Sequence, residues 1–140
     1  MKIIIKVFFF FIFSFFNLLA GEIVVKVNNL QETDGLIHLA LYDDSKLFPE
    51  NSGKKIGLVK DTMDVYQNGF VIKNLDESYY AIAIYHDENS NNKFDTFLSI
   101  PKERYGFSND APVFLGPPKF EDAAFFLKKN EIIEINISLR

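Results

Sequence analysis

Apolar and polar side chains alternate along several short stretches of the chain. Residues 22–30 read EIVVKVNNL, and the same period of two returns in residues 35–44 and in residues 131–139. Successive side chains of a β-strand point to opposite faces, so this pattern predicts half-buried strands. The turn-forming residues 33–35, Thr-Asp-Gly, separate the first two stretches and predict that these pair as a hairpin.

Three further stretches complete a β-rich pattern. Residues 69–75 and 123–127 predict strands, and the continuous apolar run of residues 79–85 predicts a central strand that is covered on both faces. Residues 43–62 are rich in turn formers and predict a loop with a short turn of helix, while residues 87–122 predict one long ordered loop. Because no stretch shows a helical period, we expect an all-β chain. Its form should be a single immunoglobulin-like or transthyretin-like β-sandwich over residues 21–140.

The first twenty residues have the layout of a signal peptide. Lys2 and Lys6 precede an apolar run from Val7 to Phe16, and the small residue Ala20 stands before Gly21. The run is short for a membrane helix, which needs about 20 apolar residues. We therefore predict that residues 1–20 are removed and that a periplasmic or secreted protein remains, with no stable membrane span. An uncleaved N-terminal anchor is the alternative.

Charge and cysteine content narrow the functional classes. The formal charge is −4, and it becomes −6 when Lys2 and Lys6 leave with the signal peptide. An acidic domain without a basic run argues against nucleic-acid binding. The chain contains no cysteine, so in an oxidising compartment its stability must come from packing or from a bound ion. We expect a monomer.

One polar cluster interrupts the apolar pattern. Residues 85–95, YHDENSNNKFD, place oxygen-bearing groups at every second position: Asp87, Asn89, Asn91, the backbone carbonyl of Lys93, and Asp95. Calcium prefers six to eight oxygen ligands, and this spacing matches the first nine positions of an EF-hand-type loop. The spacing predicts a structural calcium site that these five residues hold.

The pattern departs from an EF-hand at its last position. The bidentate acid expected at position twelve is replaced by Leu98, so a further ligand must come from elsewhere. The acidic candidates are Glu88, Glu103, Asp110 and Glu121. Two carboxylates in the loop predict a weak affinity, about 10⁻⁴ to 10⁻³ M. A solvated turn stabilised by Asn and Asp side chains is the alternative, since these residues form such turns without a metal.

Other candidate chemistry is sparse. His86 precedes the polar cluster, and a metal-assisted hydrolase of the cell envelope that uses His86 is the alternative to a non-enzymatic binding module. No residue is assigned a catalytic role, and no nucleotide motif implies a cofactor. Tyr105, Phe107, Phe114 and Phe120 gather near the polar cluster. They could bind a glycan or protein ligand of the cell envelope, or fold back to cap the core.

Several ordered motifs carry a family resemblance that covers nearly all of residues 21–140. They are a Tyr-Ala strand, an oxygen-rich loop, an Ile-Pro-x-Glu segment, a Tyr-Gly-Phe-Ser-Asn segment and a Gly-Pro-Pro-x-Phe segment. Here they fall at Tyr80 and Ala81; His86, Asp87, Asn89, Asn91 and Asp95; Ile100, Pro101 and Glu103; Tyr105 to Asn109; and Gly116, Pro117, Pro118, Phe120 and Ala123. The chain resembles the bacterial secreted family labelled domain of unknown function 2141. The resemblance implies a small secreted β protein and no particular activity.

Overall fold

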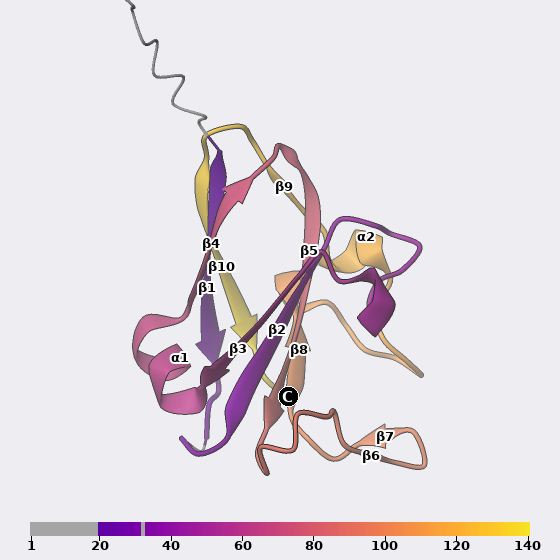
Figure 1. Ribbon diagram of the computed structural model, residues 1–140. Coiled ribbons are helices and arrows are strands. Elements are labelled where there is room, and N and C mark those ends of the chain that lie inside the picture. Colours follow the sequence, from indigo (N-terminus) through magenta and orange to yellow (C-terminus); the bar gives the residue numbers. More distant parts are fainter. Residues whose placement is uncertain (1–19, 32) are drawn as a thin grey trace, which may run out of the picture.

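The computed structural model describes residues 20–31 and 33–140, and it has the predicted all-β fold (Figure 1). Two main sheets carry the structure. The predicted signal peptide falls on residues 1–20 and so lies outside the described residues, apart from Ala20. No helix of the described part is long and apolar enough to cross a membrane.

The first sheet contains three strands in the order β10-β1-β4. Its central strand β1 (Gly21–Asn28) runs parallel to β10 (Ile132–Ser138) and antiparallel to β4 (Phe70–Leu75). The first and last strands of the described chain therefore lie side by side in this sheet.

The second sheet has the order β3-β2-β5-β8. Its strands are β3 (Ile56–Asp61), β2 (Leu36–Tyr42), β5 (Ser78–Asp87) and β8 (Tyr105–Phe107). The long strand β5 pairs with β8 near its end and with β9 (Phe125–Leu127) at its beginning. The prediction that residues 79–85 form a central strand is confirmed.

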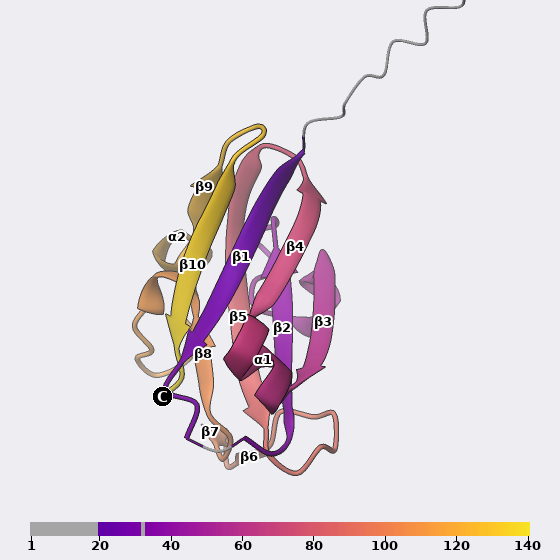
Figure 2. The ribbon, with the colours of Figure 1, turned by 90° about the vertical axis from the view of Figure 1, so that its left-hand side faces the viewer.

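The core lies between the two sheets, which Figure 2 shows one in front of the other. The predicted inward positions are buried in the main cluster or packed against it. They are Ile23, Val25 and Val27 of β1; Ile37, Leu39 and Leu41 of β2; Phe70 and Ile72 of β4; and Ile133, Ile135, Ile137 and Leu139 at the C-terminal end. The period of two therefore identified the buried face of each of these strands.

The predicted hairpin of the first two strands is wrong. β1 pairs with β10 and β4, whereas β2 pairs with β3 and β5, so the two strands belong to different sheets. A turn sequence specifies that the chain reverses, but the partner is decided by which apolar faces can be buried together.

The segment predicted as a loop with a short turn of helix at residues 43–62 contains more structure than expected, because it also includes the strand β3. A 3₁₀ turn (Asn51–Gly53) precedes β3, and the helix α1 (Thr62–Asn68) follows it directly. The helix has two turns and buries only Thr62 and Val65, so it leaves no helical period in the sequence.

The long segment after β5 is ordered by short elements. They are the β6–β7 hairpin (Thr96–Phe97 and Ile100–Pro101), β8, a second 3₁₀ turn (Ser108–Asp110) and the helix α2 (Phe120–Ala123). Ser108 ties them together, because its buried hydroxyl accepts the Ile82 N–H at 2.9 Å and donates to the Ala123 carbonyl at 2.6 Å. Phe107 and Phe120 join a second apolar cluster on the outer face of the second sheet.

Candidate metal loop and ligand groove

The polar cluster begins at the last residue of β5. Asp87 is fully buried, and its Oδ1 accepts the N–H of Asn91 at 3.0 Å while its Oδ2 accepts the N–H of Asn92 at 2.7 Å. One carboxylate thus closes the turn that follows the strand. Asn92 has φ of 61°, so the left-handed position expected for a loop of this type is occupied by an asparagine, which tolerates it.

The two predicted asparagine ligands and Asp95 converge. The Nδ2 groups of Asn89 and Asn91 both donate to Asp95 Oδ2, at 2.8 and 3.0 Å. Their Oδ1 atoms accept the backbone N–H two residues on, Asn91 at 3.1 Å and Lys93 at 2.8 Å, as in turns stabilised by asparagine. These side-chain hydrogen bonds are those expected of a polar turn. They also hold the acidic and amide side chains in contact with one another.

Glu103 adds a third carboxylate to this cluster. Its Oε2 accepts the Asp95 N–H at 2.9 Å, while its Oε1 is buried with no hydrogen-bond partner in the described structure. Only 6% of the residue is exposed. Burial raises the pKa of the Glu103 carboxyl, and the charges of Asp87 and Asp95 raise it further, although backbone N–H groups of Asp95 and Glu88 oppose this.

In the described residues, the side chains of the remaining acidic candidates form no hydrogen bond with the cluster. Asp110 accepts hydrogen bonds from Ser138, at 2.8 Å from the backbone N–H and 3.3 Å from the hydroxyl, and Glu88 and Glu121 are exposed. In residues 20–31 and 33–140, no group of three or more His, Cys, Asp and Glu side chains is placed so that it could hold a metal ion by itself. Any cation here would therefore also need the amide and backbone oxygens of the loop.

His86 is separated from the polar cluster. Adjacent residues of a strand point to opposite faces, so the His86 ring points toward the other sheet, while the buried Asp87 side chain lies on the outer face of the second sheet. Its Nε2 is 2.7 Å from the Asp34 carbonyl oxygen and 3.2 Å from Thr62 Oγ1. His86 is buried and does not line the groove described below.

His38 is the histidine that reaches the cluster. Its Nε2 lies 3.3 Å from Asp87 Oδ2, and its ring stacks on Tyr85 with centroids 4.5 Å apart. The sequence places His38 on the outward face of its strand. Only the pairing register, which sets His38 opposite Tyr85, brings it to Asp87.

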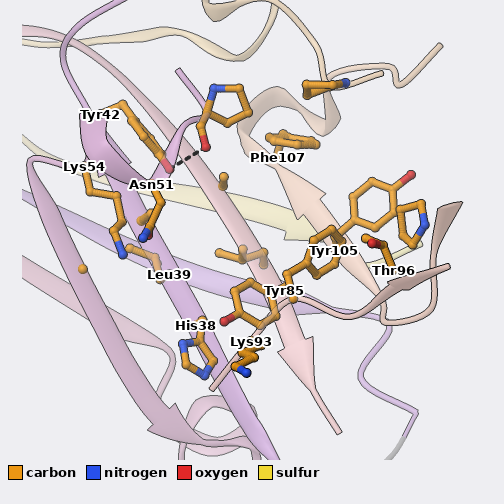
Figure 3. Close-up of a pocket in the computed structure, with 18 of the residues that line it drawn as sticks. His38, Leu39, Tyr42, Asn51, Lys54, Tyr85, Lys93, Thr96, Tyr105 and Phe107 are labelled. Carbon is orange, nitrogen blue, oxygen red and sulfur yellow. Dashed lines mark hydrogen bonds between the residues drawn. The ribbon is translucent and has the colours of Figure 1, made fainter. Parts of the chain in front are cut away.

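A groove of about 910 Å³ runs over the outer face of the second sheet beside the loop (Figure 3). Tyr42, Asn51 and Lys54 lie toward one end, and His38, Tyr85 and Lys93 toward the other. Its volume and its mixture of aromatic and polar side chains are typical of ligand sites.

The aromatic part of the groove is contiguous. Phe94 packs against Tyr85 and Tyr105, with ring centroids 5.2 and 5.9 Å apart. Burial raises the pKa of Tyr85 to about 12, and the charges of Asp87, Glu103 and Asp95 add to this. Tyr85 therefore presents a neutral hydroxyl at physiological pH.

The four aromatics considered as a binding patch divide into three environments. Phe107 and Phe120 are buried in the second cluster, Tyr105 is half-buried against it, and Phe114 is exposed. Tyr105 and Phe107 also line the groove, so folding back onto the core and lining a binding surface are combined in these two residues. Sequence spacing could not separate these cases, because all four lie in one irregular segment.

Comparisons with known proteins place the chain in a bacterial group. The family model described as "Uncharacterized protein conserved in bacteria (DUF2141)" matches residues 25–134 and confirms the resemblance drawn from the motifs. No curated protein matches the chain. No solved structure matches it either.

Proposed function

The chain belongs to this family of uncharacterised bacterial proteins, and we propose that it is an exported, non-enzymatic binding module. In this proposal a calcium ion fixes the loop that forms one wall of the groove. The ligand is a glycan or a protein of the cell envelope, received in the groove over the second sheet.

The proposed ion is held by Asp87, Asn89, Asn91, the Lys93 carbonyl and Asp95, with Glu103 as the acid that the sequence pattern lacked. These six groups satisfy the preference of calcium for six to eight oxygen ligands. Each asparagine Oδ1 has two lone pairs, so it can accept a backbone N–H and also face a cation. A third carboxylate also makes the affinity higher than two would allow.

The observation that carries the proposal is the buried Oε1 of Glu103. A buried carboxylate oxygen without a partner is unfavourable, and two other carboxylates nearby raise the pKa of the same group. A divalent cation beside Glu103 supplies the missing partner and reverses the electrostatic repulsion. A polar turn accounts for the hydrogen bond from the Asp95 N–H to Oε2, but it leaves Oε1 without a partner.

The ion would act on the groove directly, because residues of the loop that holds it also line the groove. Lys93 and Phe94 belong to the loop and Thr96 follows it, and all three line the groove, so fixing the loop also fixes this wall. The tyrosine and phenylalanine faces suit the C–H faces of a sugar or an apolar side chain. Lys54 and Lys93 offer hydrogen bonds at either end.

Thermal and chemical unfolding of the Gly21–Arg140 segment with calcium or chelator tests the proposal. This segment contains both sheets and both apolar clusters. Calcium at 100 times its dissociation constant should raise the free energy of unfolding by about 2.7 kcal/mol. Glu103→Gln should remove most of this gain, because the substitution keeps the shape and deletes the charge.

Glu88→Gln is the matched control, since it deletes the same charge from an exposed side chain beside the loop. It should keep the calcium response. If millimolar calcium leaves the unfolding transition of the wild type unchanged, or if both variants respond like the wild type, the calcium site is wrong.

A further inference from the structure

The outer face of the first sheet carries a modification motif that neither the calcium loop nor the groove uses. Residues 134–138 of β10 read Glu-Ile-Asn-Ile-Ser, so a serine stands two residues after Asn136 and the residue between them is not proline. This is the Asn-x-Ser/Thr pattern at which oligosaccharides are joined to asparagine in exported proteins. No other asparagine of the sequence has Ser or Thr at that distance.

Glu134 makes the motif more specific. The bacterial enzymes that form this linkage also read an acidic side chain two residues before the asparagine, and Glu134 stands at that position. The chain belongs to a family of bacterial proteins, so the five-residue form of the motif is the one that applies. The residues that this form requires, Glu134, Asn136 and Ser138, are all present.

Strand formation alone does not explain Asn136. The period of two makes residues 134, 136 and 138 polar, but asparagine is one of the residues that strands disfavour. Within the described residues its amide forms one hydrogen bond, in which Nδ2 donates to Glu134 Oε1 at 3.3 Å. A threonine would suit the strand better, so asparagine at this position contributes little to the fold.

The folded protein leaves room for a glycan at Asn136. The residue is exposed, and the strand register places it beside the half-buried Lys26 of β1. Its neighbours Ile135 and Ile137 pack on the core side of the strand, so Asn136 points away from the core. Figure 2 shows β10 at the front of the first sheet, and no helix or strand of the described residues lies over it. A sugar on Nδ2 would therefore project into solvent without displacing a buried side chain.

The enzyme has to meet the motif before β10 joins the sheet. In the folded protein β10 is paired with β1, and the Ser138 hydroxyl donates to Asp110 Oδ2 at 3.3 Å. The pairing spans more than a hundred residues of the chain. Such contacts form late, because the entropy of loop closure is lost before they contribute. A chain that is being exported therefore presents residues 134–138 unpaired.

We propose that Asn136 is an N-glycosylation site whose second substrate is an oligosaccharide linked to polyprenyl diphosphate. In the transfer, Asn136 Nδ2 forms a bond to the anomeric carbon of the first sugar and loses one proton. The bond from that carbon to the diphosphate oxygen breaks, and polyprenyl diphosphate leaves with the electron pair. This inference rests on the export included in the proposed function, and it does not depend on calcium or on the groove.

Expression of residues 1–140 in a bacterial host that has such a transferase and its lipid-linked oligosaccharide tests the site. Mass spectrometry of the exported protein should show the mass of one glycan, located at Asn136 by fragmentation of the tryptic peptide 130–140. Asn136→Gln and Ser138→Ala should each abolish the added mass. Glu134→Gln should lower the modified fraction severalfold, because it removes the acid and keeps the shape.

Asn130 provides a control within the same peptide. It is exposed in the turn before β10 and lacks both the acid and the hydroxyl, so it should stay unmodified. Lys128→Glu combined with Ile132→Ser builds the five-residue motif around Asn130. In the Asn136→Gln background this variant should be glycosylated at Asn130.

A second version of the chain separates failure of this site from failure of export. In it, residues 1–20 are replaced by an established signal peptide. If only this version is exported and carries the glycan on Asn136, export by residues 1–20 is wrong and the glycosylation site stands. If Asn136 carries no glycan in this version, in cells whose own acceptor proteins are glycosylated, the proposed site is wrong. Modification of the engineered Asn130 motif in those cells would then show that β10 itself excludes the enzyme.

Discussion

The sandwich interior and the segment after β5 are ordered in different ways. The interior is built from alternating apolar residues that bury against the facing sheet. Residues 88–122 contain only short strands, and their turns use side-chain hydrogen bonds and left-handed residues. Among the described non-glycine residues with positive φ, the following lie in this segment: Ser90, Asn92, Leu98, Ser99, Asn109, Asp110 and Leu115.

The difference shows which part of the molecule can respond to a ligand. Burial between two sheets is insensitive to small molecules at the surface, whereas a loop held by polar contacts changes its stability when a cation or a ligand adds a contact. Substitutions in the interior should therefore shift global stability with no dependence on calcium. Substitutions in the segment should act locally or through ions.

The largest effect is expected in the interior. Phe70 of β4 is fully buried in the main cluster, so Phe70→Ala leaves a cavity between the sheets. The free energy of unfolding should fall by about 3–5 kcal/mol, by the same amount in calcium and in chelator. Urea denaturation of both forms in both conditions measures this change.

The neighbouring Val71 is the matched control, because it lies on the same strand and points to the solvent side. Val71→Ala should stay within about 0.5 kcal/mol of the wild type. A loss for Val71→Ala as large as for Phe70→Ala would contradict the assignment of the buried face.

A smaller effect is expected where Ser108 fixes the segment to β5. Ser108→Ala leaves the buried Ile82 N–H without its acceptor and the Ala123 carbonyl without a donor, which should cost about 1–3 kcal/mol. Hydrogen exchange should show the protection loss concentrated in residues 108–124. Ser138→Ala is the control, since its exposed hydroxyl bonds only Asp110. Equal protection loss across the first sheet would show that Ser108 supports the whole fold instead.

The sequence predicted the interior because its information there is local. Every second residue reports which face is buried, so the inward positions of β1, β2, β4 and β10 followed from period alone, whereas the continuous apolar run of β5 indicated only a covered central strand. Strand partners did not follow, because β1 meets β10 across more than a hundred residues and no local pattern records that contact. The predicted hairpin failed for this reason.

The polar cluster was predicted only in part. The alternate spacing identified Asp87, Asn89, Asn91 and Asp95, which the side-chain hydrogen bonds bring together. It left Glu103 as one of four acids, and only the fold shows which of them is buried beside Asp95. His38 was missed altogether, because its contact with Asp87 depends on the register between β2 and β5.

The smallest effect concerns how the stability of the calcium-free protein depends on pH. It links the stability of the whole fold to one carboxyl group in the segment after β5. The pKa of Glu103 is raised in the fold by burial and by the charges of Asp87 and Asp95. An acid whose pKa is higher in the folded than in the unfolded state releases its proton less readily when folded. Stability in chelator should therefore fall as the pH rises from the ordinary glutamate pKa through the raised one, an interval that begins near pH 4.5.

Glu103→Gln should remove this decrease, because the glutamine carries no proton to lose. In chelator at neutral pH the variant should thus be more stable than the wild type, whereas in calcium it should be less stable. If the order of stability of the two proteins reverses between chelator and calcium, the Glu103 charge serves to bind a cation. A side chain that only packs would give no such reversal. If Glu103→Gln destabilises the protein equally in calcium and in chelator, Glu103 contributes packing and hydrogen bonding to the Asp95 N–H. The cluster is then a polar turn that orders the groove wall without an ion.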